Sequence, residues 1–178
     1  AALLVAAGYD PGLLAEALPH FRTEILRGQV VEADGVTWIL DCYNASPAGM
    51  QGALESLGDV PTDGRRVLVL ADMLELGQET VERHQMLIKP IVRLARSGAV
   101  DLLALGPNFS RIARDLQTEL EGAGGSARGF ESRDEVIEAL RRELRPGDQV
   151  LLKGSHAFGL EAVAEAIAPG ILARAANS

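Results

Sequence analysis

Short apolar runs alternate with helix-like segments along most of this sequence, and this alternation is its most constraining feature. The strand-like runs lie at residues 27–33, 36–41, 65–72, 99–106, 128–130 and 148–154. Segments with helical periodicity separate all but the first two. Strands connected in this way form a mostly parallel sheet that helices cover on both faces. The pattern therefore predicts an α/β fold, specifically a three-layer αβα, Rossmann-like domain.

The first two runs are the exception, because only Asp34-Gly35 separates them. An Asp-Gly pair between two strand-like runs is typical of an antiparallel hairpin. The helices are expected at residues 46–57, 78–97, 108–121, 132–143 and 158–168.

The first 25 residues have a different pattern, with helices expected at residues 1–7 and 10–20. The sequence begins without a methionine, inside an alanine-rich stretch that resembles the middle of a helix. We therefore expect a fragment of a longer protein, with a helical remnant at residues 1–25 and the α/β domain at residues 26–178.

The amino-acid composition limits the classes of partner that this protein is expected to bind. The formal net charge is −8, which disfavours nucleic acid and anionic membranes. No apolar run reaches the roughly 18 residues that a membrane-spanning helix needs. Cys42 is the single cysteine, so it has no internal disulfide partner, and we expect a reducing, cytoplasmic location.

Polar residues follow four of the predicted strands, where a parallel sheet would bring them to one edge. Ligands of open α/β sheets bind beyond the carboxyl ends of the strands. This edge is therefore the candidate site, and its members are Asp41, Tyr43, Asn44, Ser46, Asp72, Glu75, Gly77, Gly106, Pro107, Asn108, Lys153, Gly154, Ser155 and His156.

Several of these residues also have a purely structural interpretation. Asp41 and Asn44 could stabilise a turn, and Ser46 before Pro47 is a good helix N-cap. Asp72 could cap the following turn. Lys153 could be a solvated surface lysine, although a lysine followed by Gly-Ser suits a bound carboxylate or phosphate.

Common catalytic motifs are missing from the 178 residues. There is no G-x-x-x-x-G-K-S/T phosphate-binding loop, no zinc-like spacing of Cys and His, and no G-x-S-x-G elbow. Cys42 has no histidine close to it in sequence, so we do not expect a nucleophile there. His84 could equally be an ordinary histidine of its helix.

Three stretches resemble the Mur ligases of peptidoglycan synthesis: LDCYNASPAGMQGAL, VLVLADMLELGQETVERH and VLLKGSHAFGLEAVAEAI. LRGQVV is similar to the arginine-containing strand that precedes the Asp-Tyr-Asn turn in that family. The four segments have the family's order and spacing. The Tyr-Asn-Ala turn favours the ligases that add D-Ala-D-Ala over their sister enzymes.

The resemblance implies an ATP-dependent carboxylate–amine ligase of three domains. Residues 1–25 would be the tail of the central ATPase domain, and residues 26–178 the C-terminal domain. The expected ligands are ATP, UDP-N-acetylmuramoyl-tripeptide and D-Ala-D-Ala, with ATP and Mg held mainly by the central domain. We expect a monomer, and we expect the fragment alone to be inactive.

The resemblance also implies roles for single residues. Nucleotide contacts are expected from Arg27, Asp41 and Asn44. Substrate contacts are expected from Tyr43, Ser46, Asp72, Lys153, Ser155 and His156. No catalytic or metal-binding residue is expected on this chain.

Two of these residues depart from the family pattern, because Ser46 replaces an asparagine and His156 an arginine. The alternative functions are another Mur-type or folate-type amino-acid ligase domain, or a non-catalytic Rossmann-like binding module. A phosphate-binding loop encoded upstream in the parent gene would favour a ligase.

Overall fold

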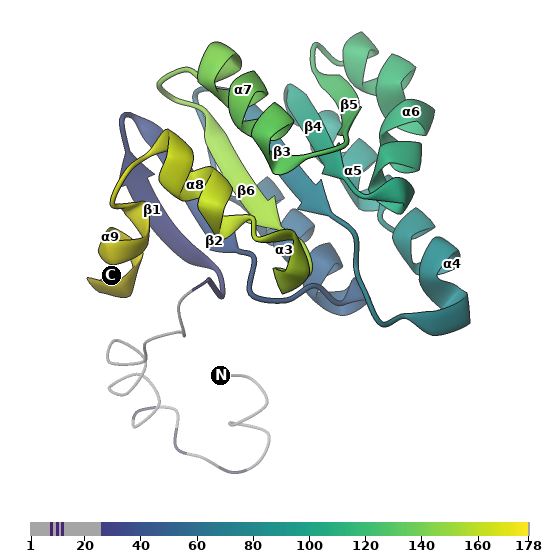
Figure 1. The fold of residues 1–178 in the computed structure, drawn as a ribbon, viewed down its shortest axis with the longest axis horizontal. Coiled ribbons are helices and arrows are strands. Elements are labelled where there is room, and N and C mark those ends of the chain that lie inside the picture. Colours follow the sequence, from purple (N-terminus) through teal and green to yellow (C-terminus); the bar gives the residue numbers. More distant parts are fainter. Residues whose placement is uncertain (1–7, 9, 11, 13–25, 178) are drawn as a thin grey trace.

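A six-stranded sheet forms the centre of the computed structural model, which describes residues 8, 10, 12 and 26–177 (Figure 1). The strand order is β1-β2-β6-β3-β4-β5. The helices predicted at residues 1–7 and 10–20 lie outside the described residues. The strands are β1 (Gln29–Ala33), β2 (Val36–Asp41), β3 (Arg66–Ala71), β4 (Val100–Leu105), β5 (Ser126–Phe130) and β6 (Gln149–Lys153).

The sheet is parallel apart from its first strand, which confirms the predicted α/β class. β2, β6, β3, β4 and β5 run in the same direction, and β1 pairs antiparallel with β2. The β1–β2 turn is the predicted Asp34-Gly35 pair, with φ of 53° and 76°. Both angles are positive, as the tight turns of hairpins require.

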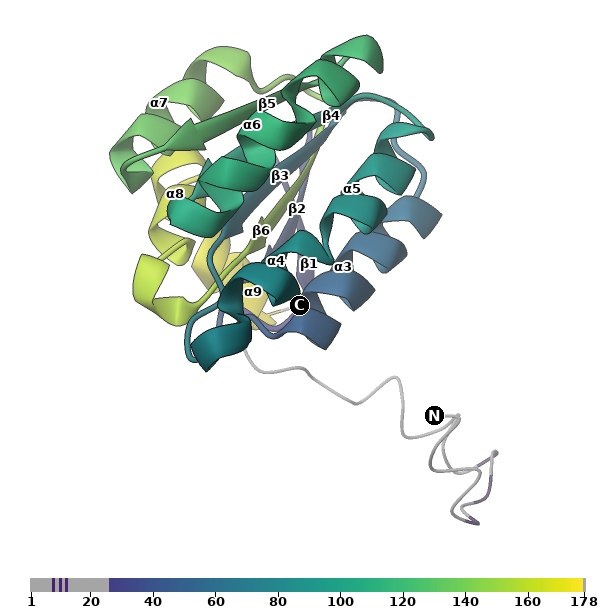
Figure 2. The ribbon, with the colours of Figure 1, turned by 90° about the vertical axis from the view of Figure 1, so that its right-hand side faces the viewer.

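Helices cover both faces of the sheet (Figure 2). One face packs against α7 (Arg133–Glu143), α8 (Glu161–Ile167) and α9 (Ile171–Asn177). The other packs against α3 (Pro47–Asp59), α5 (Ile88–Ala95) and α6 (Pro107–Gly122). Successive residues of the central strands serve opposite faces. In β3, Val67 and Val69 join the first apolar cluster, and Leu68 and Leu70 join the second.

The helix predicted at residues 78–97 is interrupted, so that prediction was wrong in its extent. The structure has a short 3-10 turn, η2 (Gly77–Glu79), then α4 (Thr80–Gln85), and then α5. Pro90 lies in the first turn of α5. A proline there loses no helical hydrogen bond, but deep inside one continuous helix it would clash with the carbonyl four residues before it. The chain therefore restarts its helix after Met86.

The last predicted helix, at residues 158–168, also differs in its limits. A 3-10 turn, η3 (His156–Phe158), precedes α8, and α9 extends the helical structure beyond the predicted end.

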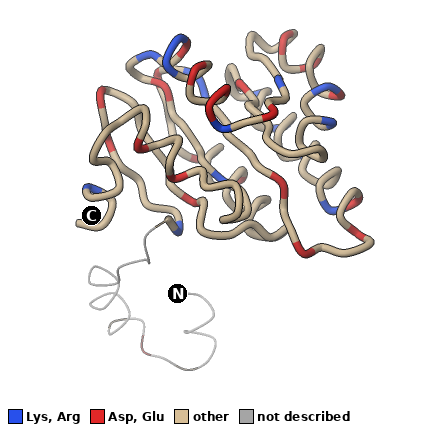
Figure 3. The backbone as a smooth tube through the Cα atoms, in the orientation of Figure 1, with Lys and Arg blue, Asp and Glu red and all other residues tan. Residues whose placement is uncertain are grey.

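The charges of the described chain are interspersed, with Lys and Arg among Asp and Glu along the tube in Figure 3. Local pairs, rather than a broad field of one sign, therefore govern the electrostatics of particular sites. Among the described residues, no helix combines the length and the apolar character needed to cross a membrane.

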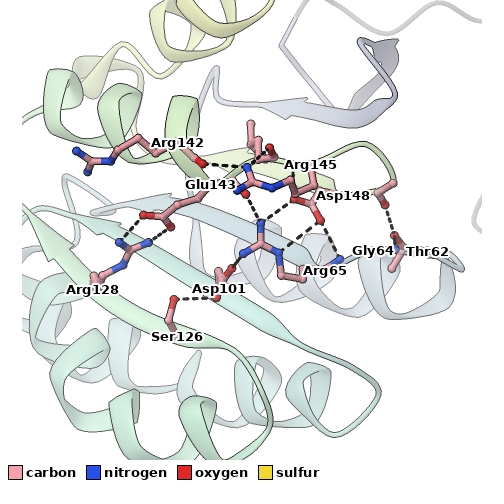
Figure 4. A network of polar contacts seen from close by, with 12 residues as sticks. Thr62, Gly64, Arg65, Asp101, Ser126, Arg128, Arg142, Glu143, Arg145 and Asp148 are labelled. Atoms are coloured by element: carbon pink, nitrogen blue, oxygen red, sulfur yellow. Dashed lines mark hydrogen bonds and ion pairs between the residues drawn. The ribbon is translucent and has the colours of Figure 1, made fainter.

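A network of charged groups lies at the amino ends of the strands (Figure 4). Arg65, just before β3, donates from Nη1 to Asp101 Oδ2 over 2.6 Å and from Nη2 to Asp148 Oδ2 over 2.8 Å. Nη2 also donates to the backbone carbonyl of Glu143 over 2.6 Å. Arg128 pairs with the Glu143 carboxylate. The network ties β3, β4, β6 and the end of α7 together, on the edge opposite the candidate site.

Candidate functional site

The four sets of polar residues do meet at one edge of the sheet. The arrowheads of β2, β6 and β3 point the same way in Figure 1, and Asp41 lies opposite Lys153 in the β2–β6 register. Lys153 in turn lies opposite Leu70 of β3, and Ala71 lies opposite Leu105 of β4. The residues that follow these strand ends therefore share the edge, as predicted.

Lys153 is buried and forms an ion pair at the centre of this edge. Its Nζ lies 2.6 Å from Asp41 Oδ2, and only 5% of its side chain is exposed. Nζ also donates to the backbone carbonyls of Asn44, at 3.3 Å, and Asp41, at 3.4 Å. The interpretation of Lys153 as a solvated surface lysine was therefore wrong. Two residues that the sequence analysis assigned to different ligands thus form an ion pair with each other.

An exposed stack of side chains lies beside this pair. The Arg27 guanidinium lies 4.2 Å from the centroid of the Tyr43 ring, and the Tyr43 and His156 rings are 5.8 Å apart. Tyr43 is 45% exposed. A guanidinium over an aromatic face gains a cation–π interaction and keeps its N–H donors in its plane. This stack thus places a cation and an exposed aromatic ring side by side at the edge.

Asp72 caps the amino terminus of α6 from the end of a neighbouring strand. Its Oδ1 accepts from the Phe109 backbone N–H at 2.8 Å, and its Oδ2 accepts from the Asn108 backbone at 3.1 Å and side chain at 2.7 Å. Gly106 is the N-cap residue and has no side chain to do this. A Cβ at Gly106 would lie 2.6 Å from the Asp72 carboxyl carbon. The sequence-based alternative had Asp72 capping the turn that follows it, whereas these contacts cap a helix that begins 35 residues later.

The other predicted site residues make local contacts. Asn44 Oδ1 accepts from the Ala45 N–H over 2.8 Å. Ser46 Oγ accepts from the Gly49 N–H over 3.2 Å, so Ser46 is the N-cap of α3. The Ser155 N–H donates to the Asp72 carbonyl over 3.3 Å. This backbone hydrogen bond connects the Lys153 and Asp72 parts of the edge.

His84, whose role the sequence motifs left open, is buried in the same region. Its Nε2 accepts from the Met73 N–H at 2.9 Å, and its Nδ1 lies 2.6 Å from the Thr80 carbonyl. A carbonyl only accepts, so Nδ1 is the ring nitrogen that donates in this pair of contacts. The ring also meets Phe109 edge-on, with centroids 5.3 Å apart. His84 therefore fixes the loop that follows β3.

A groove of about 370 Å³ adjoins Asp41 between the β1–β2 hairpin and α3. Val30 and Ile39 form its sheet side. Sequence reasoning missed it, although small residues at helical spacing could have indicated it. Its α3 side is formed by Gly49, Gly52, Ala53, Ser56 and Leu57.

Cys42 is buried directly after β2, and burial together with the charge of Glu161 raises the pKa of its thiol to about 12. The thiol therefore stays protonated at neutral pH. We expect the folded chain to react with a disulfide reagent such as DTNB at pH 8 at least about 100-fold more slowly than the chain in urea. The release of the coloured thiolate measures both rates. Equal rates would contradict the buried position.

Within residues 8, 10, 12 and 26–177, no group of three or more His, Cys, Asp or Glu side chains could hold a metal ion.

Together, the fold and this polar edge define a Rossmann-like α/β domain that can accept a ligand beyond its strand ends. Residues 23–156 match a protein family described as "Mur ligase, glutamate ligase domain". The chain therefore belongs to the Mur ligase family.

Curated relatives support the same family. The chain is 38% identical over 150 residues to the UDP-N-acetylmuramoyl-tripeptide–D-alanyl-D-alanine ligase of Mycobacterium tuberculosis (strain H37Rv), covering 75% of this chain and 29% of that protein. It is 33% identical over 162 residues to the ligase of the same name from Treponema pallidum, covering 89% of this chain and 34% of that protein. The chain thus spans about a third of the length of these relatives.

Solved structures share the fold. The MurF ligase of Thermotoga maritima in complex with ADP matches with a TM-score of 0.62 and 27% identity, over 86% of this chain and 33% of that one. A MurF structure from Acinetobacter baumannii matches with a TM-score of 0.68 and 21% identity, over 92% of this chain and 35% of that one.

Proposed function

We propose that residues 26–178 are the C-terminal domain of an ATP-dependent ligase that adds D-Ala-D-Ala to UDP-N-acetylmuramoyl-tripeptide in the cytoplasm, and that residues 1–25 are the tail of its central ATPase domain. The observation that carries the proposal is the 38% identity to ligases of that name over 75% of the chain. The four segments quoted above are the stretches of the chain in which this similarity is easiest to recognise.

We assign the nucleotide-facing role to Arg27, Asp41 and Asn44, and direct substrate contact to Tyr43, Ser155 and His156. Support for the assignment comes from the exposed Arg27–Tyr43–His156 stack and from the partly exposed Asp41 side chain. The side-chain oxygens of Ser46 and Asp72 cap helix termini, exposed Ser46 at α3 and buried Asp72 at α6. We therefore assign these two residues to the support of the edge.

The proposed reaction makes a peptide bond at the expense of ATP. ATP phosphorylates the terminal carboxylate of the tripeptide, the amine of D-Ala-D-Ala attacks the acyl phosphate, and phosphate leaves. The main demand on the protein is to hold charged reactants in line and exclude water. In our proposal the preceding domain holds Mg and the triphosphate, because these 178 residues contain no phosphate-binding loop. This domain orients the ribose side and the incoming dipeptide.

The test uses the full-length parent enzyme with ATP and UDP-N-acetylmuramoyl-tripeptide. We expect ADP release with D-Ala-D-Ala and none with D-Glu or meso-diaminopimelate. Asp41→Ala should lower kcat/KM for ATP by about 10- to 100-fold, because a charged hydrogen-bond acceptor is lost. The matched control is Asp115→Ala, at an exposed position of α6. It should leave turnover unchanged.

Turnover with a different acceptor would reassign the domain to a neighbouring ligase. If no acceptor supports ADP release, the ligase proposal is wrong. The 178-residue chain alone is expected to release no ADP above a protein-free blank.

A further inference from the structure

We infer that Lys153 is a positioning residue that acts through Asp41, and that it does not contact a substrate itself. The inference rests on the proposed function, because it assigns Asp41 to the nucleotide. It departs from the sequence-based expectation that Lys153 binds the dipeptide.

The first argument concerns hydrogen-bond donors. A lysine ammonium has three N–H donors and no acceptor. Nζ of Lys153 has three acceptors within the protein: Asp41 Oδ2 at 2.6 Å, the Asn44 carbonyl at 3.3 Å and the Asp41 carbonyl at 3.4 Å. All three donors are therefore engaged, and none remains for the carboxylate of an incoming dipeptide.

The second argument concerns access. The Lys153 side chain is only 5% exposed, whereas the Asp41 side chain is 24% exposed. A ligand arriving at the edge can therefore reach Asp41 but not the ammonium behind it. The pair is oriented with its cation inside and its carboxylate outside.

The third argument concerns the turn that carries the predicted nucleotide contacts. Asp41 and Lys153 are opposite residues of parallel neighbours, β2 and β6. The additional contact with the Asn44 carbonyl connects residues 41–44 to β6 from a position 109 residues away in sequence. Removal of the ammonium would release the Asp41 carboxylate and the Asn44 backbone together. Loss of the Lys153 ammonium should therefore impair nucleotide binding, the role proposed for Asp41.

The experiment measures Michaelis constants of the full-length enzyme for each substrate separately. Lys153→Met keeps most of the aliphatic stem and removes the charge. We expect KM for ATP to rise by about tenfold, as for the loss of one charge-assisted contact, and KM for D-Ala-D-Ala to stay within about twofold. The control is Lys89→Met, which removes the only other lysine of these 178 residues, at an exposed position of α5. It should change neither constant.

A double-mutant cycle tests whether the effect passes through Asp41. If it does, Asp41→Asn/Lys153→Met should have nearly the same kcat/KM for ATP as Asp41→Asn alone. Lys153→Arg should restore part of the loss, because it returns a cation. Circular dichroism verifies that each variant is folded. If Lys153→Met alone does not fold, the Asp41→Asn/Lys153→Met variant is measured in its place. The double variant buries no unpaired charge at this pair.

Two results would overturn the inference: a tenfold rise in KM for D-Ala-D-Ala with an unchanged KM for ATP, or effects of the two substitutions that simply multiply. If the wild type uses another acceptor, the proposed function fails, and the ATP constants measured with that acceptor still decide the inference. If no acceptor supports turnover, the dissociation constant for ADP, measured by calorimetry, takes the place of the Michaelis constants for ATP. An affinity unchanged by Lys153→Met would then refute the role of Lys153.

Discussion

Replacement of Asp72 by alanine is expected to lower the free energy of unfolding of the 178-residue chain by about 3–5 kcal/mol. The carboxylate accepts three hydrogen bonds at the start of α6, from Asn108 and Phe109. Asp72 is 2% exposed, so water cannot readily replace it. The N-cap residue, Gly106, offers no side chain as a substitute. Alanine would thus leave the buried Phe109 N–H and the partly buried Asn108 donors without this acceptor, and it would remove a negative charge from the positive end of the helix.

Urea unfolding followed by circular dichroism measures this effect. Asp72→Asn keeps one carbonyl acceptor and should give an intermediate loss. Asp115→Ala, an exposed position on the same helix, should change stability by less than about 0.5 kcal/mol. A loss below about 1 kcal/mol for Asp72→Ala would mean that the cap contributes little.

The second large effect is expected from Arg65→Met at the opposite edge of the sheet. This substitution removes the cation between Asp101 and Asp148, whose side chains are 8% and 3% exposed. Two buried carboxylates would lose their partner, and we expect a loss of about 2–4 kcal/mol at pH 7. The lower limit allows for solvent screening of Arg65, which is 31% exposed. Arg111→Met, an exposed position on α6, is the matched control.

The same network predicts how stability depends on pH. Burial alone would raise the pKa of Asp148, but hydrogen bonds from Arg65 and from the Arg145 and Arg65 backbones outweigh burial, and the pKa is lowered. The contribution of Asp148 is therefore fully present above its unfolded pKa, near 3.9, and is lost as pH falls through the lower folded value.

The difference in urea midpoint between the wild type and Arg65→Met should consequently be large from pH 5 to 7 and shrink below about pH 4. A difference that is independent of pH down to pH 2 would contradict an ionic origin. A packing defect would produce that result instead.

Local sequence signals predicted most of the fold. Strand runs and the Asp34-Gly35 hairpin were recognisable because the backbone preferences that define them act over a few residues. The helix at residues 78–97 was predicted too long because apolar periodicity continues across its break. The position of Pro90 indicates the new start of the helix only once η2 and α4 are known.

The candidate edge was predictable, but its internal contacts were not. A parallel sheet alone is enough to bring the polar residues that follow its strands to one edge. The register of β2, β6 and β3 confirms this arrangement. That Lys153 would meet Asp41 depends on β6 lying next to β2, across 112 residues of sequence. No local pattern encodes this neighbour relation, so the ion pair between these two residues could not be predicted from the sequence.

The strand order also bears on how this domain is made. β6 is the last strand in sequence, yet it separates β2 from β3 in the sheet. A ribosome synthesises residues 26–148 before this strand emerges, and until then the hairpin and the β3–β4–β5 half have no shared strand to join them. The Asp41 turn would meanwhile lack its ammonium. Nascent chains stalled before Gln149 should consequently be protease-sensitive and recruit chaperones, whereas chains released beyond α9 should resist digestion.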